Sequence, residues 1–212
     1  MLYALLCDKM LTFAPITVPK SIMSASSSPL FFNPLVWLRR FRHRKGYGVH
    51  SPFAFGFITG VVYESTPYYA YEELVGMHPW WMRLPGFRPI ARCRLLFRLA
   101  NFAEARTVRF VGDLEWERKY VCAAVPHAVE VDSVADFVLV DGDHIADAVA
   151  MASAMPVNGM LVVEGIAKSA ENKEIWKKVE ADANTCVTFD LHDYGIAFFN
   201  HRLTKQSYVV NF

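Results

Sequence analysis

Apolar and polar residues alternate in two different ways along this chain, and the change comes near residue 107. Beyond that point, short apolar runs alternate with segments whose apolar residues recur at helical spacing. The runs predict strands, and the segments between them predict helices. Strands are expected over 107–112, 128–133, 136–142 and 159–165, as a pair around a turn within 186–201, and within 206–212; helices are expected over 114–125, 145–155 and 171–183. This order is typical of an α/β fold with a mostly parallel sheet and a closing antiparallel hairpin.

The pattern before residue 107 is mainly helical. Leu35, Leu38 and Phe41 recur at helical spacing, and Ser51-Pro52 is a typical helix start because serine caps free N–H groups. Two further helices are expected to bury stripes made of Phe53, Phe57, Ile58 and Val61, and of Ile90, Leu95, Leu96, Leu99 and Phe102. His50 is either a structural histidine at a helix start or part of a lid over a substrate.

We expect three parts: an N-terminal extension, partly disordered, over residues 1–34, a helical region over 35–106 that packs on the core, and the α/β core over 107–212. With 212 residues, 53% of them hydrophobic and 20% charged, the chain can bury one sizeable core.

The four cysteines, Cys7, Cys93, Cys122 and Cys186, lie far apart and form no CxxC pair. That spacing favours free thiols in a reducing compartment over disulfides or a zinc site. No stretch is long enough to span a bilayer. The apolar start is interrupted by Asp8 and does not have the pattern of a signal peptide. A cytoplasmic location is therefore expected. The polar segment that begins at Met23 makes residues 1–22 a candidate upstream extension.

The net charge of +1 conceals an uneven distribution. Residues 1–100 carry 12 Lys/Arg and 4 Asp/Glu, whereas residues 101–212 carry 10 and 17. Basic residues cluster from Arg39 to Lys45, in a segment that can face phosphate, membrane headgroups, an acidic partner or solvent. Because such a run is most often a solvated helix face, nucleic-acid binding is not expected. A protein partner or a homo-oligomer stays open.

Polar residues follow four of the expected strands. In an open α/β sheet, ligands bind beyond the carboxyl ends of the strands, so these residues are the candidate site. They are Gly112 and Asp113 after the first strand, Asp132 after the second, Asp141, Asp143 and His144 after the third, and Glu164 and Gly165 after the fourth.

Each residue type has a chemical use. Asp132 can accept hydrogen bonds from both hydroxyls of a ribose, and Gly112 lets backbone approach a ligand. Asp141 with Glu164 could hold a divalent cation, and His144 can act as a general base.

The alternative is structural. An Asp-Gly pair after a strand is ordinary turn chemistry. Asp143 can cap a helix that begins at Ile145.

Several segments resemble class I S-adenosylmethionine-dependent methyltransferases. They are "RKGYGVHSPFAF", "LLFRLANF", "DFVLVDGDH", "EIWKKV" and "DYGIAFF", and they run from Lys45 to Phe199. More narrowly, the chain is similar to a bacterial group with a GVHSPFxF segment. The resemblance implies a Rossmann-like methyltransferase fold, S-adenosylmethionine as cofactor and methyl transfer to an unknown small molecule. It places Gly112, Asp113, Asp132 and Asp141 at the cofactor, and Asp141 and His144 as the catalytic residues.

The chain departs from that family at three places. Arg109 and Trp116 stand where the glycine-rich first loop has Glu and a small residue. Residues 133–135 alone separate the second and third expected strands, so one strand–helix unit is missing. Glu164-Gly165 replaces a common Asp-Asp pair. The alternative to methyl transfer is therefore a catalytically degenerate methyltransferase fold that serves as a binding or interaction module.

Overall fold

The computed structural model describes residues 33–83 and 88–212. The expectation for residues 1–22, and the expected extension apart from Asn33 and Pro34, lie outside this part of the chain.

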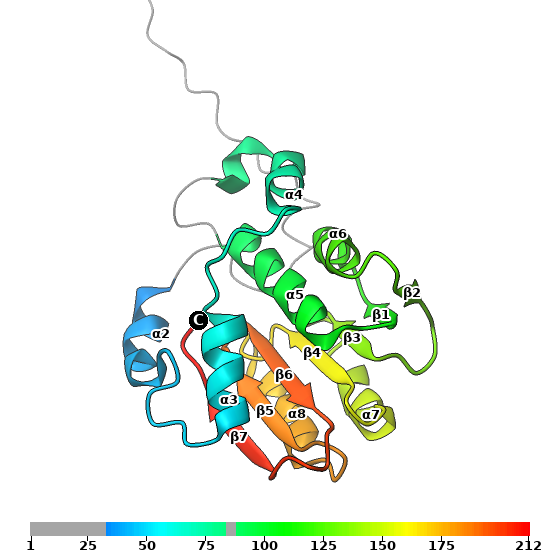
Figure 1. Ribbon diagram of the computed structural model, residues 1–212. Helices are drawn as coiled ribbons and strands as arrows, with labels where there is room; N and C mark the ends of the chain where they lie inside the picture. The colour runs from blue at the N-terminus through cyan, green and yellow to red at the C-terminus, as the bar shows by residue number, and fades with distance from the viewer. Residues whose placement is uncertain (1–32, 84–87) are drawn as a thin grey trace, which may run out of the picture.

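One seven-stranded sheet forms the centre of the molecule, in the order β2-β1-β3-β4-β6-β5-β7 (Figure 1). The strands are β1 (Thr107–Val111), β2 (Val129–Glu130), β3 (Phe137–Val140), β4 (Met160–Glu164), β5 (Val187–Asp190), β6 (Tyr194–Phe198) and β7 (Gln206–Val209). Strands β2, β1, β3 and β4 pair in parallel, β6 is antiparallel to β4 and β5, and β7 is parallel to β5. The predicted α/β class, the mostly parallel sheet and the antiparallel hairpin are confirmed.

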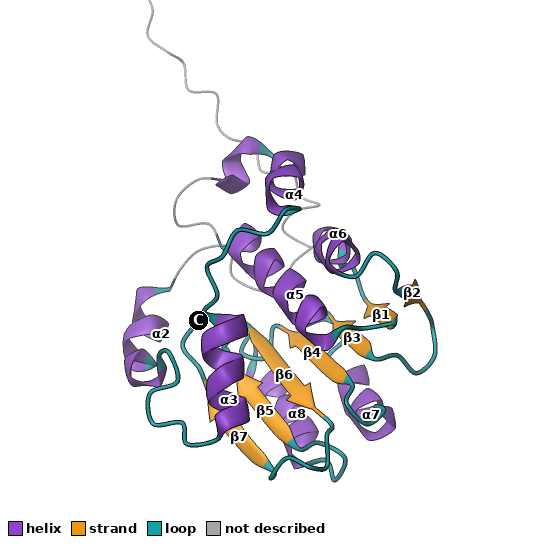
Figure 2. Cartoon of the chain, viewed as in Figure 1, coloured by secondary structure: helices purple, strands orange, loops and turns teal. Residues whose placement is uncertain are grey.

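Helices cover both faces of the sheet (Figure 2). The helices of the described residues are α2 (Pro34–Arg39), η1 (Phe41–His43), α3 (Pro52–Phe57), the π-helical turn η2 (Ile58–Val62), α4 (Tyr71–Met77), η3 (Trp80–Arg83), α5 (Pro89–Ala103), α6 (Glu115–Ala124), α7 (Asp147–Ala154) and α8 (Ala170–Ala181). In Figure 1, α3, α5 and α6 lie on one face, and α7 and α8 lie on the other. Among the described residues, no helix is long and apolar enough to cross a membrane.

The core divides along the sheet because neighbouring strand residues point to opposite faces. Phe137 and Leu139 join the cluster beneath α3 and α5, whereas Val138 and Val140 join the cluster beneath α7 and α8. All four are at most 2% exposed, which explains why β3 appears in the sequence as an unbroken apolar run.

Strand β2 forms one edge of the sheet, and no helix or strand lies between it and β3 in the sequence. Residues 131–136 join the two directly, and Val129 in β2 is 61% exposed. The short connection runs beside β1, where Arg109 Nη1 donates to the Ser133 carbonyl oxygen at 3.3 Å. The sheet has seven strands despite this shortcut because β7 is added beyond β5.

The helices predicted in the first half are present, but Phe102, expected in the buried stripe of α5, is 43% exposed. Ser51 Oγ accepts a hydrogen bond from the Ala54 N–H at 3.3 Å, and Pro52 is the first residue of α3. In the expected stripe of that helix, Phe57, Ile58 and Val61 are buried. In α2, by contrast, the apolar residues at helical spacing are not buried, since Leu35 and Leu38 are exposed.

Candidate functional site

Asp141 joins the carboxyl ends of β1 and β3. Its Oδ2 accepts a hydrogen bond from the Asp113 N–H at 2.9 Å. Its Oδ1 accepts from the N–H groups of Asp143 at 3.0 Å and His144 at 2.8 Å, and it lies 2.8 Å from His144 Nδ1. One carboxylate thus holds both strand-end loops together.

Gly112 lies directly against the same carboxylate. Its φ is +105°, a backbone conformation that side chains rarely adopt, and a Cβ atom built on it would overlap the Asp141 carboxylate. The glycine is therefore required for Asp141 to reach the β1 loop. The group that lies against this glycine is thus the Asp141 side chain.

His144 has a fixed orientation although it is half exposed. Its side chain is 51% exposed, while Nδ1 is held by Asp141. The hydrogen bond to the Asp141 carboxylate, and then the negative charge of that carboxylate, raise the pKa of His144 above 6.5. Burial works to raise the pKa of Asp141, but the hydrogen bonds from His144 and the Asp113 N–H outweigh it, and that pKa is lowered. With Nδ1 engaged, Nε2 is the ring nitrogen available to a ligand.

The structural alternative for Asp143 is wrong. Helix α7 begins at Asp147, its N-cap is Ala146, and no side chain caps it. The loop before α7 is held by Asp141, so Asp143 is free to face Lys168, with Oδ1 and Nζ 2.5 Å apart.

Asp132 lies at the end of β2 with an open carboxylate. The residue is exposed, and no hydrogen bond or ion pair joins it to another residue in 33–83 or 88–212. Both oxygens can therefore accept hydrogen bonds from a ligand.

A hollow of about 380 Å³ opens next to the connection that follows Asp132. Its lining comes from β1, β3, α7 and the connection, and it includes Val111, Ser133, Val138 and Met151. The volume lies in the range of small-molecule sites, and most of these side chains are apolar. The hollow thus lies between α7 and the direct connection from β2 to β3.

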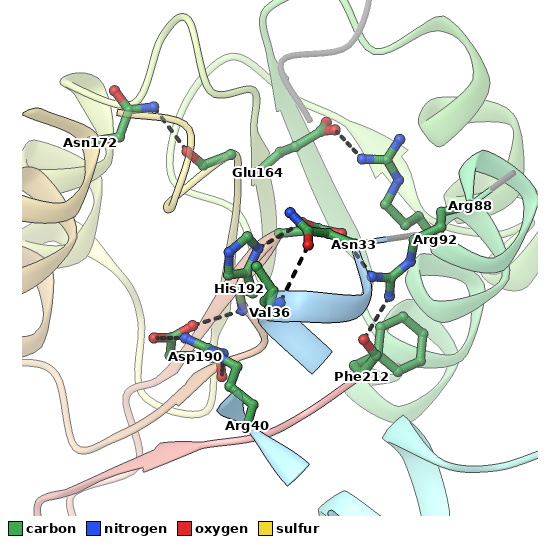
Figure 3. A network of polar contacts seen from close by, with 12 residues as sticks. Asn33, Val36, Arg40, Arg88, Arg92, Glu164, Asn172, Asp190, His192 and Phe212 are labelled. Carbon is green, nitrogen blue, oxygen red and sulfur yellow. Dashed lines mark hydrogen bonds and ion pairs between the residues drawn. The ribbon is translucent and has the colours of Figure 1, made fainter. Parts of the chain in front are cut away.

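Glu164, at the end of β4, belongs to a separate buried polar cluster (Figure 3). Its Oε1 lies 3.8 Å from Nη1 of Arg92 in α5, and both side chains are at most 3% exposed. Asp193, before β6, lies 3.5 Å from Arg88. The cation beside Glu164 is thus a guanidinium. Among the described residues, no group of three His, Cys, Asp or Glu side chains is placed to hold a metal ion.

Glu117, in the first turn of α6, has a raised pKa. Burial, and then the charge of Glu164, raise its pKa from 4.5 to about 7. The neighbouring Trp116 stacks on His78, with ring centroids 4.3 Å apart. Burial, and then the charge of Arg83, lower the pKa of His78 to about 4. The Trp116 indole thus packs against the segment that links α4 to η3.

Arg92 was missed by the expected stripe in α5, although the sequence carries a signal for it. Residues 92, 95, 96 and 99 follow the i, i+3, i+4, i+7 spacing of one helix face, which places this arginine among buried leucines. Such a position requires a buried anionic partner, and Glu164 supplies it.

Comparisons with known proteins show a likeness in structure and no match in sequence. No protein-family model matches the chain, and no curated protein matches it. The chain is similar to the SAH-bound methyltransferase PaMTH1 of Podospora anserina, with a TM-score of 0.43 and 8% sequence identity over 82% of this chain and 99% of that chain.

Proposed function

We propose that this chain is an S-adenosylmethionine-dependent methyltransferase that acts on a small molecule. The observation that supports this most is the presence of an oriented imidazole and an open carboxylate at the same edge of the sheet, after β3 and β2, which flank β1. His144 is held through Nδ1 by Asp141 at 2.8 Å, and Asp132 lies at the end of β2, on the other side of β1. Proton acceptance and ribose binding are the two tasks that these groups can perform.

The nucleoside end of the cofactor fits this part of the molecule. Asp132 would accept hydrogen bonds from the ribose hydroxyls. The apolar hollow that begins at Ser133 and Val134 offers a flat base a dry surface next to it.

The amino-acid end does not fit in the usual way. The Asp141 carboxylate fills the space over Gly112 and takes the Asp113 N–H that would otherwise face a ligand. The amino-acid end must therefore be held by groups other than the β1 loop.

When bound, S-adenosylmethionine supplies an electrophilic methyl carbon. The protein's own contribution is to remove a proton from the hydroxyl or amine that becomes methylated. His144 Nε2 would accept that proton, and Asp141 acts as a positioning residue that fixes the ring and stabilises its charged form.

Calorimetric titration with S-adenosylhomocysteine, paired with a methylation assay on small hydroxyl and amine compounds, tests this proposal. We expect binding that Asp132→Asn weakens at least about tenfold, whereas Glu171→Gln, an exposed change on α8, leaves it unaltered. His144→Gln is expected to reduce turnover without changing cofactor affinity, and Asp141→Asn to shift the pH profile of turnover to lower pH. The absence of heat at millimolar cofactor would refute the proposal.

A further inference from the structure

The outer face of α2 and η1 is apolar and open to solvent. Leu35 is 71% exposed, Leu38 is 66% exposed and Phe41 is 50% exposed. Because they recur every three residues through a short helix that continues as a 3₁₀ turn, they form one stripe, which we call the α2 stripe. Tyr47, 83% exposed, follows it in sequence.

The inner side of the same segment is anchored to the body of the protein. Arg40 forms an ion pair with Asp190 at 2.7 Å and donates to the Asp190 carbonyl at 3.1 Å (Figure 3). Asn211 adds two contacts, because its Nδ2 donates to the Trp37 carbonyl at 3.1 Å and its N–H donates to the His43 carbonyl at 2.9 Å. These contacts fix which side of α2 faces outward, so the α2 stripe cannot turn inward without breaking them.

A second, basic row accompanies the stripe. Arg39 and Arg42 are exposed and lie three residues apart, and Lys45 is exposed in the turn that follows η1. These cations form no ion pair with any residue in the described ranges. Arg44 lies over the rings of Trp37 and Phe41, at 5.1 and 5.6 Å from their centroids. No Asp or Glu occurs between residues 33 and 63, so nothing in this stretch of sequence offsets the positive charge.

We propose that the α2 stripe and its basic row dock this protein on the surface of an anionic membrane. Exposed leucine and aromatic side chains can enter the boundary between headgroups and acyl chains, while flanking arginine and lysine contact lipid phosphates. An anionic membrane would contact both the apolar side chains of the α2 stripe and the basic row. A nucleic acid would contact the cations but leave Leu35 and Leu38 in water.

The arrangement predicts weak, reversible binding that depends on lipid charge. One short helix presents few apolar side chains, so neutral lipid is expected to retain little protein. Since the cations lie in solvent, salt should screen their attraction to the surface. This function is separate from the proposed methyl transfer, because the stripe contains none of the strand-end residues.

Co-sedimentation of the full chain with phosphatidylcholine vesicles, with and without phosphatidylglycerol, tests the proposal. We expect retention on the anionic vesicles alone, decreasing as salt rises. Leu35→Gln with Leu38→Gln, and separately Arg39→Glu with Arg42→Glu, should each lower the bound fraction at fixed lipid at least about tenfold. Val157→Gln with Arg202→Glu changes an exposed apolar and an exposed basic residue elsewhere and should have no effect.

Three outcomes would overturn the proposal. The first is no retention on anionic vesicles. The second is binding that the arginine variants abolish and the leucine variants leave intact, which would indicate a purely electrostatic partner such as a nucleic acid. The third is a lowered unfolding midpoint in the Leu35→Gln, Leu38→Gln protein without lipid, because it would mean that the chain's own residues cover the stripe. Far-UV circular dichroism of the same variants shows whether a lost interaction reflects a lost fold.

Discussion

The Asp141 carboxylate occupies the space that a side chain on Gly112 would need. The two residues lie at the ends of neighbouring parallel strands, β3 and β1, and their approach brings the Asp113 N–H within 2.9 Å of Oδ2. A residue that looks catalytic in sequence is thus also a structural connection between two strands. The same contact leaves His144 oriented at the edge of the sheet.

Replacing Gly112 by alanine should destabilise the protein. The substitution places a Cβ atom at positive φ, which costs about 1–2 kcal/mol, and it also displaces Asp141 from its hydrogen bonds. We expect a loss of about 2–4 kcal/mol in the free energy of unfolding, measured by urea denaturation. Gly48→Ala is the matched control, because Gly48 also has positive φ but has nothing within 4 Å of its Cβ position. Equal losses in the two variants would show that the carboxylate is not in the way.

Asp141→Asn should lower the pKa of His144 toward 6.5, since the hydrogen bond and charge that raise it are weakened. NMR titration of the imidazole measures this directly. In the unaltered protein, the pair stabilises the fold below the ordinary histidine pKa, and this contribution is lost as pH rises through the raised value. Asp147→Asn, which removes a weaker nearby charge, should change the pKa much less. An unchanged His144 pKa in Asp141→Asn would contradict the pairing.

Glu117 should make stability fall as pH rises. Its pKa is raised from 4.5 to about 7, so the folded state favours the protonated form. The contribution of Glu117 to the free energy of unfolding is fully present below pH 4.5. It decreases as pH rises to about 7, by at most about 3 kcal/mol. Glu117→Gln should abolish this decrease, as measured by urea midpoints between those pH values. Glu115→Gln, an exposed change in the same turn, should preserve it.

Removing the Arg92 guanidinium should leave the buried Glu164 carboxylate without a cation to offset the cost of its burial. Arg92→Met is expected to lower the free energy of unfolding by about 3–5 kcal/mol at neutral pH, because Glu164 is inaccessible to water. Adding Glu164→Gln should recover part of the loss. Arg118→Met is the control, since its pair with Glu130 is more than two-fifths exposed and is worth at most about 1 kcal/mol. Similar losses at the two sites would contradict a buried pair.

The strands were the most predictable part of the fold. β1, β3 and β4 lie within 107–112, 136–142 and 159–165. β3 and β4 are buried on both faces and therefore appear as unbroken apolar runs, whereas β1 is only partly buried. β2 covers Val129–Glu130 alone, shorter than expected, since an edge strand pairs on one side and its polar residues face solvent.

The helix at residue 34 shows what spacing leaves undetermined. The recurrence of Leu35, Leu38 and Phe41 correctly indicates helical geometry, but the same recurrence in Phe57 and Val61 accompanies burial. Spacing shows that residues share a face, whereas the partner of that face depends on the tertiary fold.

The candidate site was predictable in position but not in its internal contacts. Strand ends locate Asp132, Asp141 and His144. The contact between Asp141 and Asp113 joins residues 28 positions apart, and it depends on the register of β1 and β3. A single sequence carries no direct record of such a register.

The anchors of α2 also set the order in which the molecule can be completed. Arg40 binds Asp190, 150 residues later, and the His43 carbonyl accepts from the N–H of Asn211. During synthesis, α2 leaves the ribosome early but has no docking site until β5 and the last residues have emerged. The exposed leucines of α2 are therefore synthesised well before the residues that anchor this helix.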